Sequence, residues 1–389
     1  MRINFLMPCY AWGPSGGFRI VYEYANRLAA RGHDVAVVHP RRLKFPPPPE
    51  RLTLRGRARK VRLALLERFF RPSIDWHPID ERVRMLFVPD SGERYIPEGD
   101  AIFATAWHTA RSVLECSPSR GRKLYLIQHY ETWMGPKDLV DETWRFPLQK
   151  IVIAKWMVEL AAKLGSPDVV YIPNAIDRRI FRRTQPIENR PLRIAMLFSD
   201  AAWKGSREGI EALEKVRCRF PDLEVIFFGV GRRRPWIPEW IKYYQDPPQS
   251  FLIEEIYNKS RIFLHSSWSE GFPLPPAEAA SCGCALVVTD SGGIRDYVEN
   301  GVTGLVSPPK NPEALAQNLS SLLGNEDRRV LLAHAAEKFI SGFDWERNTD
   351  HLENLISDLG RNARSSQSAS CERHVDLLSP GNSKEPRNR

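Results

Sequence analysis

The sequence lacks any long hydrophobic run. Its 389 residues contain no stretch of about twenty consecutive apolar residues, which is the length that an α-helix needs to span a bilayer. The chain also opens directly on the apolar segment RINFLMP, without the charged region and the apolar region of a secretory signal. We therefore predict a cytoplasmic protein without a membrane-spanning helix.

Patterns that hold metal ions are scarce as well. The six cysteines are scattered and form no CxxC pair. Cys282 and Cys284 lie in an apolar segment, where we expect the reduced and buried thiols of a cytosolic protein. No DxD-like pair lies in a setting that would serve a divalent ion. We expect no metal ion and no other cofactor.

The net charge of +9 is concentrated in one segment. Between residues 41 and 71 there are eleven lysines and arginines and two glutamates, and eleven minus two accounts for the whole excess. Within residues 57–70, apolar and basic residues alternate at helical spacing, as in a helix that lies on an anionic membrane at the inner face of the cell membrane. A solvated helix that packs on a domain by its apolar side has the same pattern. No stacking aromatics or reading module accompany the charge, so we expect no nucleic-acid partner.

The first half of the chain has the pattern of a doubly wound α/β unit. An apolar strand at residues 2–8 leads through Gly16 and Gly17 to a periodic helix over 18–33, and a buried strand follows at 34–40. Such a βαβ unit has its turn where open α/β sheets bind ligands, although a tight turn needs glycine with or without a ligand. Further strands are expected at 83–89, 101–107 and 123–129.

A second α/β set follows a hinge-like segment. A short strand leads into PNAID at residues 173–177, and the polar run 184–191 is expected to be a linker with little order. Strands are then expected at 192–198, 223–229 and 261–267, and helices at 206–220, 250–260, 311–325, 327–340 and 343–360. Residues 362–389 are polar and serine-rich, and we expect disorder there.

Residues 269–288, SEGFPLPPAEAASCGCALVV, carry the strongest functional pattern. Glu270 precedes a turn rich in glycine and proline, and Glu278 follows it eight positions later. Because proline is tolerated in the first turn of a helix, a helix should begin where this turn ends. Its N-terminus would carry unpaired N–H groups and partial positive charge, which suit an anion, and carboxylates accept hydrogen bonds from hydroxyls. Phosphate together with a polyol describes a nucleotide sugar.

This stretch and the residues after it resemble a known family. The run EGFPLPPAEAASCGCALVVTDSGGIRDYVENGVTGLV is similar to the donor-site motif of the retaining glycosyltransferases of family 4, the glycosyl transferases of group 1. The resemblance implies an α/β GT-B fold, in which two Rossmann-like doubly wound domains face a central cleft. It also implies an acceptor domain over residues 1–180, a donor domain over 181–342, and a last helix, 343–360, that packs back on the first domain.

The resemblance further implies an activity and a set of residues. The enzyme would move a sugar, without a metal ion, from a nucleotide-sugar donor to a glycan or lipid-linked acceptor with retention of configuration, in cell-surface polysaccharide synthesis. Glu278 would accept hydrogen bonds from the ribose, and Lys204 in the run AWKGSREG would contact the diphosphate. His129 and Glu270 are assigned to catalysis beside the donor sugar, and Glu131 is close enough in sequence to share the site. The remaining donor-binding residues are Gly16, Gly17, Gly271 and Phe272.

The motif departs from the family pattern at one position. The family usually has an arginine shortly before the lysine, where this chain has Ser199 or Asp200. Arg207, Arg232 and Arg234 are the candidates to replace it.

The donor and the reaction stay open at this point. The residues QHYE and WKG are similar to the rhamnan-type and O-antigen branch, which favours dTDP-rhamnose, with UDP- and GDP-sugars as alternatives. A GT-B sugar-nucleotide epimerase, or a catalytically silent member that binds sugar nucleotides, would carry much of the same pattern.

Overall fold

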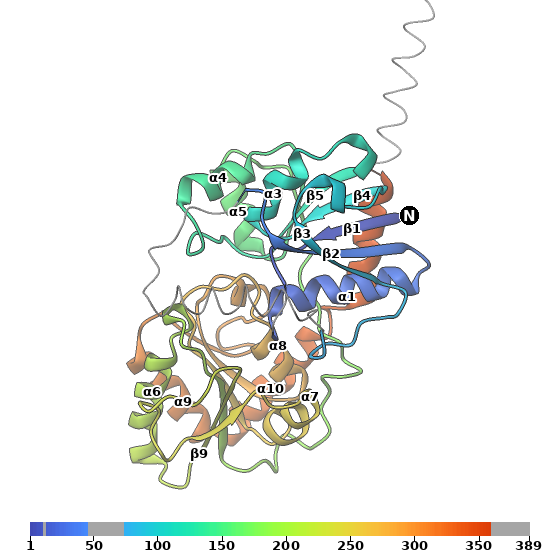
Figure 1. Cartoon of the computed structure of the whole chain (residues 1–389). Coiled ribbons are helices and arrows are strands. Elements are labelled where there is room, and N and C mark those ends of the chain that lie inside the picture. The colour runs from blue at the N-terminus through green and yellow to red at the C-terminus, as the bar shows by residue number, and fades with distance from the viewer. Residues whose placement is uncertain (11–12, 46–73, 359–389) are drawn as a thin grey trace, which may run out of the picture.

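The structure is a computed structural model that describes residues 1–10, 13–45 and 74–358. Two α/β domains lie one beside the other (Figure 1). Two segments for which we made predictions, the basic segment 57–70 and the tail 362–389, lie outside the described residues.

The first domain is built on a parallel sheet with strand order β3-β2-β1-β4-β5-β6-β7. The strands are β1 Arg2–Leu6, β2 Asp34–Arg42, β3 Arg84–Asp90, β4 Ala101–Ala104, β5 Arg122–Ile127, β6 Gln149–Val152 and β7 Val169–Tyr171. Since β1 pairs with both β2 and β4, the order reverses at β1, and ligands of doubly wound sheets bind at such a reversal, beyond the carboxyl ends of the strands. The α/β class predicted from the sequence is confirmed.

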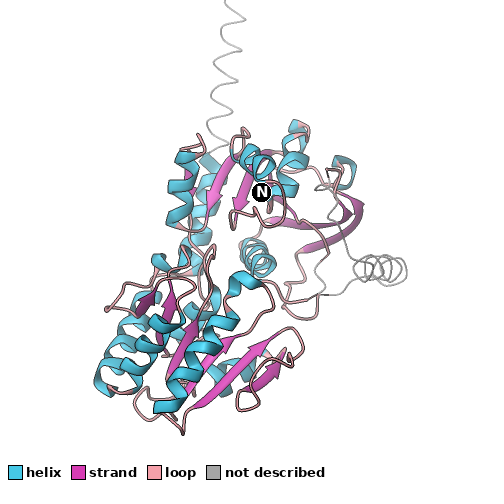
Figure 2. Cartoon of the chain, turned by 90° about the vertical axis from the view of Figure 1, so that its left-hand side faces the viewer, coloured by secondary structure: helices cyan, strands magenta, loops and turns pink. Residues whose placement is uncertain are grey.

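Helices cover both faces of this sheet (Figure 2). They are α1 Gly16–Ala30, α3 Trp107–Leu114, α4 Lys137–Trp144 and α5 Lys155–Lys163, with the short turns η1 Glu93–Tyr95 and η2 Pro118–Arg120. In α1 the residues Ile20, Tyr24 and Leu28 are buried, because residues four apart share one face of a helix. Among the described residues, no helix is both long and apolar enough to cross a bilayer.

The second domain repeats this plan on a parallel sheet with the order β10-β9-β8-β11-β12-β13. Its strands are β8 Arg193–Leu197, β9 Glu224–Gly229, β10 Lys242–Gln245, β11 Ile262–His265, β12 Ala285–Thr289 and β13 Leu305–Ser307. Its helices are α6 Ser206–Arg219, α7 Gln249–Phe251, α8 Leu274–Ser281, α9 Pro312–Leu323 and α10 Glu326–Ile340. The π-helix η4 Leu252–Tyr257 continues α7, and η3 Ala202–Lys204 and η5 Gly293–Asp296 are short turns. The edge strand β10 was not predicted, because its sequence KYYQ contains no buried residue.

The polar run 184–191 connects the two sheets without a helix or strand, but two of its residues are buried, so it is more ordered than we expected. Ile187 is fully buried in the second core. The guanidinium of Arg190 is also buried and donates to the carbonyl oxygens of Cys282 at 2.6 Å and Ser260 at 2.9 Å. A buried arginine whose donors meet backbone carbonyls holds its segment in place, and composition alone does not show those partners.

The last helix, residues 345–358, lies against the first domain (Figure 1). Arg31, which follows α1, forms ion pairs with Glu346 at 2.8 Å, Asp350 at 2.6 Å and Glu353 at 2.9 Å. His33 lies 2.8 Å from Glu353 as well. These ion pairs therefore hold the C-terminal end of α1 against the last helix.

Candidate functional site at the domain interface

The GFPLPP turn leads from β11 into α8 as the sequence predicted. The backbone N–H of Glu270 donates to the carbonyl of Ser291 at 2.7 Å, which fixes the start of the turn against the segment after β12. Prolines 273, 275 and 276 have no N–H, so the backbone donors at the start of α8 come from Gly271 and Phe272 ahead of the helix and from Leu274, its first residue. The ring of Phe272 is buried against Tyr297 at a centroid distance of 5.0 Å. Side-chain packing thus holds a turn whose donors precede a helix N-terminus.

Lys204 lies at the end of η3 and points to Glu270. Its Nζ is 2.7 Å from Glu270 Oε1. Gly205 follows with a φ of +62°, in the left-handed region that favours glycine. A Cβ on Gly205 would lie 2.0 Å from the carbonyl oxygen of Ser266, so glycine is required for η3 to approach the end of β11. The close approach brings the lysine to the carboxylate.

His265, the last residue of β11, is buried beside this pair. Its Nε2 lies 4.0 Å from Glu270 Oε1. Burial raises the pKa of Glu270, but Lys204, His265 and Ser267 together outweigh this effect and hold that pKa below its ordinary value. Burial lowers the pKa of His265 to about 4. The cluster at neutral pH therefore consists of a carboxylate, an ammonium and a neutral imidazole.

The first domain contacts this turn closely. A Cβ on Gly271 would lie 2.0 Å from the carbonyl oxygen of Gln128, so the two chains can approach only because residue 271 is glycine. The Gln128 side chain donates in turn to the carbonyl oxygen of Gly17 at 3.0 Å, and Gly16 packs near Leu274 of α8. The N-termini of α1 and α8 consequently lie next to each other at the interface, where both present N–H groups and partial positive charge.

His129 follows β5 and faces the second domain. Its ring packs edge-on against Trp133 at 4.2 Å and Trp156 at 5.7 Å between centroids. Burial lowers the pKa of His129 to about 4, against the opposite effect of the Glu270 carboxylate, so the imidazole is neutral at pH 7. The indole N–H of Trp156 donates to the carbonyl oxygen of Gly271 at 3.2 Å. His129 is thus brought to the same place as Glu270 and Lys204.

An aromatic contact crosses the interface beside His129. Trp133 of the first domain stacks on Trp203 of η3, with centroids 5.6 Å apart, and Trp133 is 41% exposed. Trp203 precedes Lys204, so the two stacked rings lie next to the cluster of Lys204, Glu270 and His265. These tryptophans were not predicted, because neither belongs to a periodic pattern.

Glu131 does not join the cluster. Its carboxylate accepts a hydrogen bond from the backbone N–H of Trp107 at 2.8 Å, at the N-terminus of α3. Burial raises the pKa of Glu131 to about 7. Two residues of sequence separation place it near His129, but the backbone turns its side chain to another helix.

Glu278 lies in α8 with its side chain 3% exposed. Tyr257 donates its hydroxyl to Glu278 Oε2 at 3.2 Å. Glu278 Oε1 lies 2.6 Å from Arg19 Nη1, and Arg19 belongs to the first turn of α1 in the other domain. Arg19 was missed, because nothing in its local sequence indicates a partner in the second domain.

Two of the three arginines that could replace the family arginine have other partners. Arg234 binds Asp200 through Nε at 2.8 Å. It therefore neutralises the acidic residue near the position where the family usually has an arginine. Arg207 lies over the ring of Trp236 at 4.4 Å. These contacts keep both arginines among residues 200–236.

Known proteins resemble this chain in sequence and fold. Residues 177–339 match the family model described as glycosyl transferases group 1. A D-inositol 3-phosphate glycosyltransferase of Corynebacterium urealyticum is 26% identical over 172 residues, which are 40% of this chain and 40% of that protein. The chain thus spans well under two thirds of the curated relatives that it matches.

Solved structures resemble more than nine tenths of the chain. The Anabaena HepE structure in complex with UDP and glucose has a TM-score of 0.68 at 17% identity, over 92% of this chain and all of that one. Sucrose-phosphate synthase from Thermosynechococcus elongatus has a TM-score of 0.69 at 15% identity, over 93% and 99%. The fold is GT-B, as predicted.

The resemblance to glycosyl transferases group 1 is confirmed. The matched region contains Lys204, Glu270, Gly271, Phe272 and Glu278, whereas Gly16, Gly17 and His129 come from the first domain. We call these eight residues the interdomain site.

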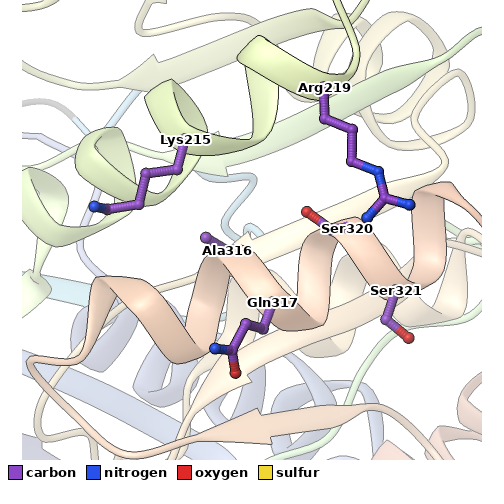
Figure 3. Close-up of a pocket in the computed structure, with 6 residues that line it drawn as sticks. All are labelled: Lys215, Arg219, Ala316, Gln317, Ser320 and Ser321. Carbon is purple, nitrogen blue, oxygen red and sulfur yellow. The ribbon is translucent and has the colours of Figure 1, made fainter.

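No metal centre accompanies this site in the described residues, and a separate groove lies elsewhere on the second domain. Among the described residues, no group of three or more histidine, cysteine and acidic side chains is arranged to hold a metal ion. A shallow groove of about 370 Å³ between α6 and α9, on the outer side of the domain, is lined by Lys215, Arg219 and small or polar residues of α9 (Figure 3). The Lys215 ammonium there is already paired with Glu313 at 2.6 Å.

Proposed function

We propose that this protein is a retaining glycosyltransferase that moves a sugar from a nucleoside diphosphate donor to a hydroxyl of an acceptor. The observation that carries the proposal is the meeting of two carboxylates, a lysine, a neutral histidine and two helix N-termini at one domain interface. The match to glycosyl transferases group 1 and the GT-B fold support it. Such a site combines anion-binding groups with hydroxyl-binding groups, as a nucleotide sugar requires.

The cations and helix ends serve the diphosphate in this proposal. Lys204 binds a phosphate oxygen, and the N–H groups at the starts of α1 and α8 contribute further donors. Because negative charge grows on the diphosphate as the glycosidic bond breaks, groups already aimed there lower the barrier. Glu278 accepts hydrogen bonds from the sugar hydroxyls of the nucleotide.

Glu270 and His129 serve the transferred sugar. Glu270 accepts hydrogen bonds from its hydroxyls, and the N–H groups of Gly271 and Phe272 donate to the donor. His129 is neutral, so one ring nitrogen donates a hydrogen bond while the other accepts. It lies within reach of Glu270 and can orient the sugar against the acceptor.

The reaction needs no carboxylate nucleophile. As the family resemblance implies, the acceptor oxygen attacks the anomeric carbon from the face of the leaving group, so configuration is retained. The bond from that carbon to the phosphate oxygen breaks, and a phosphate oxygen takes the proton of the acceptor hydroxyl. The products are the glycosylated acceptor and the nucleoside diphosphate.

The chemistry of Glu278 distinguishes between the candidate donor nucleotides. A ribose offers two neighbouring hydroxyls to the two carboxylate oxygens, whereas the deoxyribose of dTDP offers one. A thermal-shift panel of UDP, GDP and dTDP sugars tests this, because a ligand that binds the native state raises its apparent stability. A ribonucleotide that stabilises more than dTDP would disfavour the dTDP-rhamnose donor predicted from the sequence.

The decisive experiment is acceptor-dependent release of the nucleoside diphosphate. A glycosyltransferase releases it in proportion to the acceptor added, and the product sugar has the anomeric configuration of the donor. An epimerase would convert the donor without an acceptor, and a silent binding protein would bind the donor and release nothing.

We propose a glycan or a lipid-linked sugar as the acceptor. The support is the basic segment 57–70 in the sequence, which would hold the enzyme at an anionic membrane where such acceptors lie. Sedimentation with anionic liposomes at low salt tests this attachment, and a protein that stays in the supernatant would remove that support.

A further inference from the structure

Arg19 reaches from the first domain into the second. It is the fourth residue of α1, and its guanidinium lies 2.6 Å from Glu278 Oε1 of α8. The side chain is 22% exposed and also lies over the ring of Phe181 at 5.1 Å. An arginine held by a carboxylate and an aromatic face has a defined position, next to the N-terminus of α1.

Glu278 has both of its oxygens engaged in this state. Arg19 contacts Oε1 and the Tyr257 hydroxyl donates to Oε2. Because the Glu278 side chain is only 3% exposed, we expect that a nucleotide whose sugar hydroxyls bind Oε1 must displace the Arg19 guanidinium from that oxygen. The displaced guanidinium then needs a new anionic partner, because an unpaired charge in a largely buried place is costly.

The charges of the interdomain site are paired internally in two sets. Lys204 neutralises Glu270, and Arg19 neutralises Glu278. A nucleoside diphosphate sugar carries the complementary set, with phosphates for the two cations and hydroxyls for the two carboxylates. Each protein ion pair can therefore be exchanged for one charged contact and one set of hydroxyl hydrogen bonds to the ligand.

This chain lacks the arginine that the family usually has before the lysine, so another cation is needed for the diphosphate. Asp200 stands near its place and is bound by Arg234, while Arg207 lies over Trp236. Arg19 is a cation that already lies at the site, and its partner Glu278 is a carboxylate that the donor would bind.

We propose that Arg19 of the first domain is a donor-binding residue that pairs with Glu278 in the free protein and turns to the diphosphate when a nucleotide binds. This inference rests on the proposed function, since it assigns a role at the same site. It makes the first domain contribute a charged side chain to donor binding, and it couples nucleotide binding to the breaking of an interdomain ion pair.

The test compares a nucleoside with its diphosphate in the wild type and in Arg19→Gln. UDP and uridine are the probes, or GDP with guanosine or dTDP with thymidine if the panel selects those bases. Arg19→Gln should weaken the diphosphate about tenfold or more, because a charged hydrogen bond is lost. It should leave the nucleoside unchanged or tighten it, because the competitor for Glu278 is gone. The ratio of the nucleoside's dissociation constant to that of the diphosphate should therefore fall at least about tenfold.

Control variants separate this role from a structural one. Arg19→Lys keeps a charge that can reach phosphate, so the ratio should fall less than in Arg19→Gln. Arg31→Gln removes ion pairs from the far end of the same helix and should leave the ratio as in the wild type, with thermal unfolding checking that each variant is folded. A ratio unchanged in folded Arg19→Gln, or equal weakening of both ligands, would overturn the proposal. If the wild type binds none of these nucleotides, the proposed function itself fails.

Discussion

Replacing Lys204 by methionine removes one charge from the pair with Glu270 and keeps the length of the side chain. At the observed separation of 2.7 Å, two unit charges attract by roughly 6 kcal/mol with an effective dielectric constant of about 20. Desolvation offsets much of this, and removing one partner of a buried pair typically costs about 3–5 kcal/mol. Because the lysine side chain is 28% exposed and the glutamate 12%, we expect a loss of about 2–3 kcal/mol in unfolding free energy.

The assay is a double-mutant cycle read by urea denaturation and by turnover. Lys204→Met alone should be destabilised, and Lys204→Met with Glu270→Gln should recover most of the stability, because no uncompensated charge then remains. Turnover should stay low in both, since the cation proposed for the diphosphate is absent; such a loss is about 10²–10³-fold.

The matched control is Lys215→Met in the groove between α6 and α9, which should change neither stability nor turnover noticeably. Wild-type turnover in the double variant would refute the role of Lys204. If the losses of stability in the two single variants simply add in the double variant, the stabilising ion pair between Lys204 and Glu270 is refuted.

Three further outcomes are expected. Glu278→Ala should weaken nucleotide binding, and Glu270→Ala should lower turnover more than binding, each by about 2–4 kcal/mol; titration and steady-state kinetics measure both, and wild-type kinetics in the Glu278 variant would contradict the assignment. Because the pKa of Glu131 is about 7 in the folded protein against an ordinary 4.5, the native state binds the extra proton between these values. Ionisation of this carboxyl should therefore lower the free energy of unfolding as pH rises from 4.5 to 7, by at most about 3 kcal/mol. The urea midpoints of Glu131→Gln and wild type should converge at low pH and diverge near pH 7.5. Parallel pH profiles would count against the raised pKa of Glu131. EDTA should leave the rate largely unchanged, whereas a loss restored by Mg²⁺ would show that the enzyme needs a metal ion.

Local sequence patterns predicted most of the helices and strands, whereas the GT-B fold was predicted from the family resemblance. Apolar periodicity predicted α1 and the central strands, because the side-chain repeat of a helix or strand is a local property. The GFPLPP turn predicted the start of α8 for the same reason, since proline acts on the backbone beside it. Glu270 and Glu278 could be singled out because a helix start separates them at a fixed spacing.

Tertiary structure decided which of these groups meet. Arg19 pairs with Glu278, and Gly271 contacts Gln128, across two domains that no local pattern orients. Glu131, beside His129 in the sequence, turns to α3 instead. Ion pairs and close contacts depend on distances through space, and residues far apart in the chain acquire those distances when the two sheets pack and the last helix returns to the first domain.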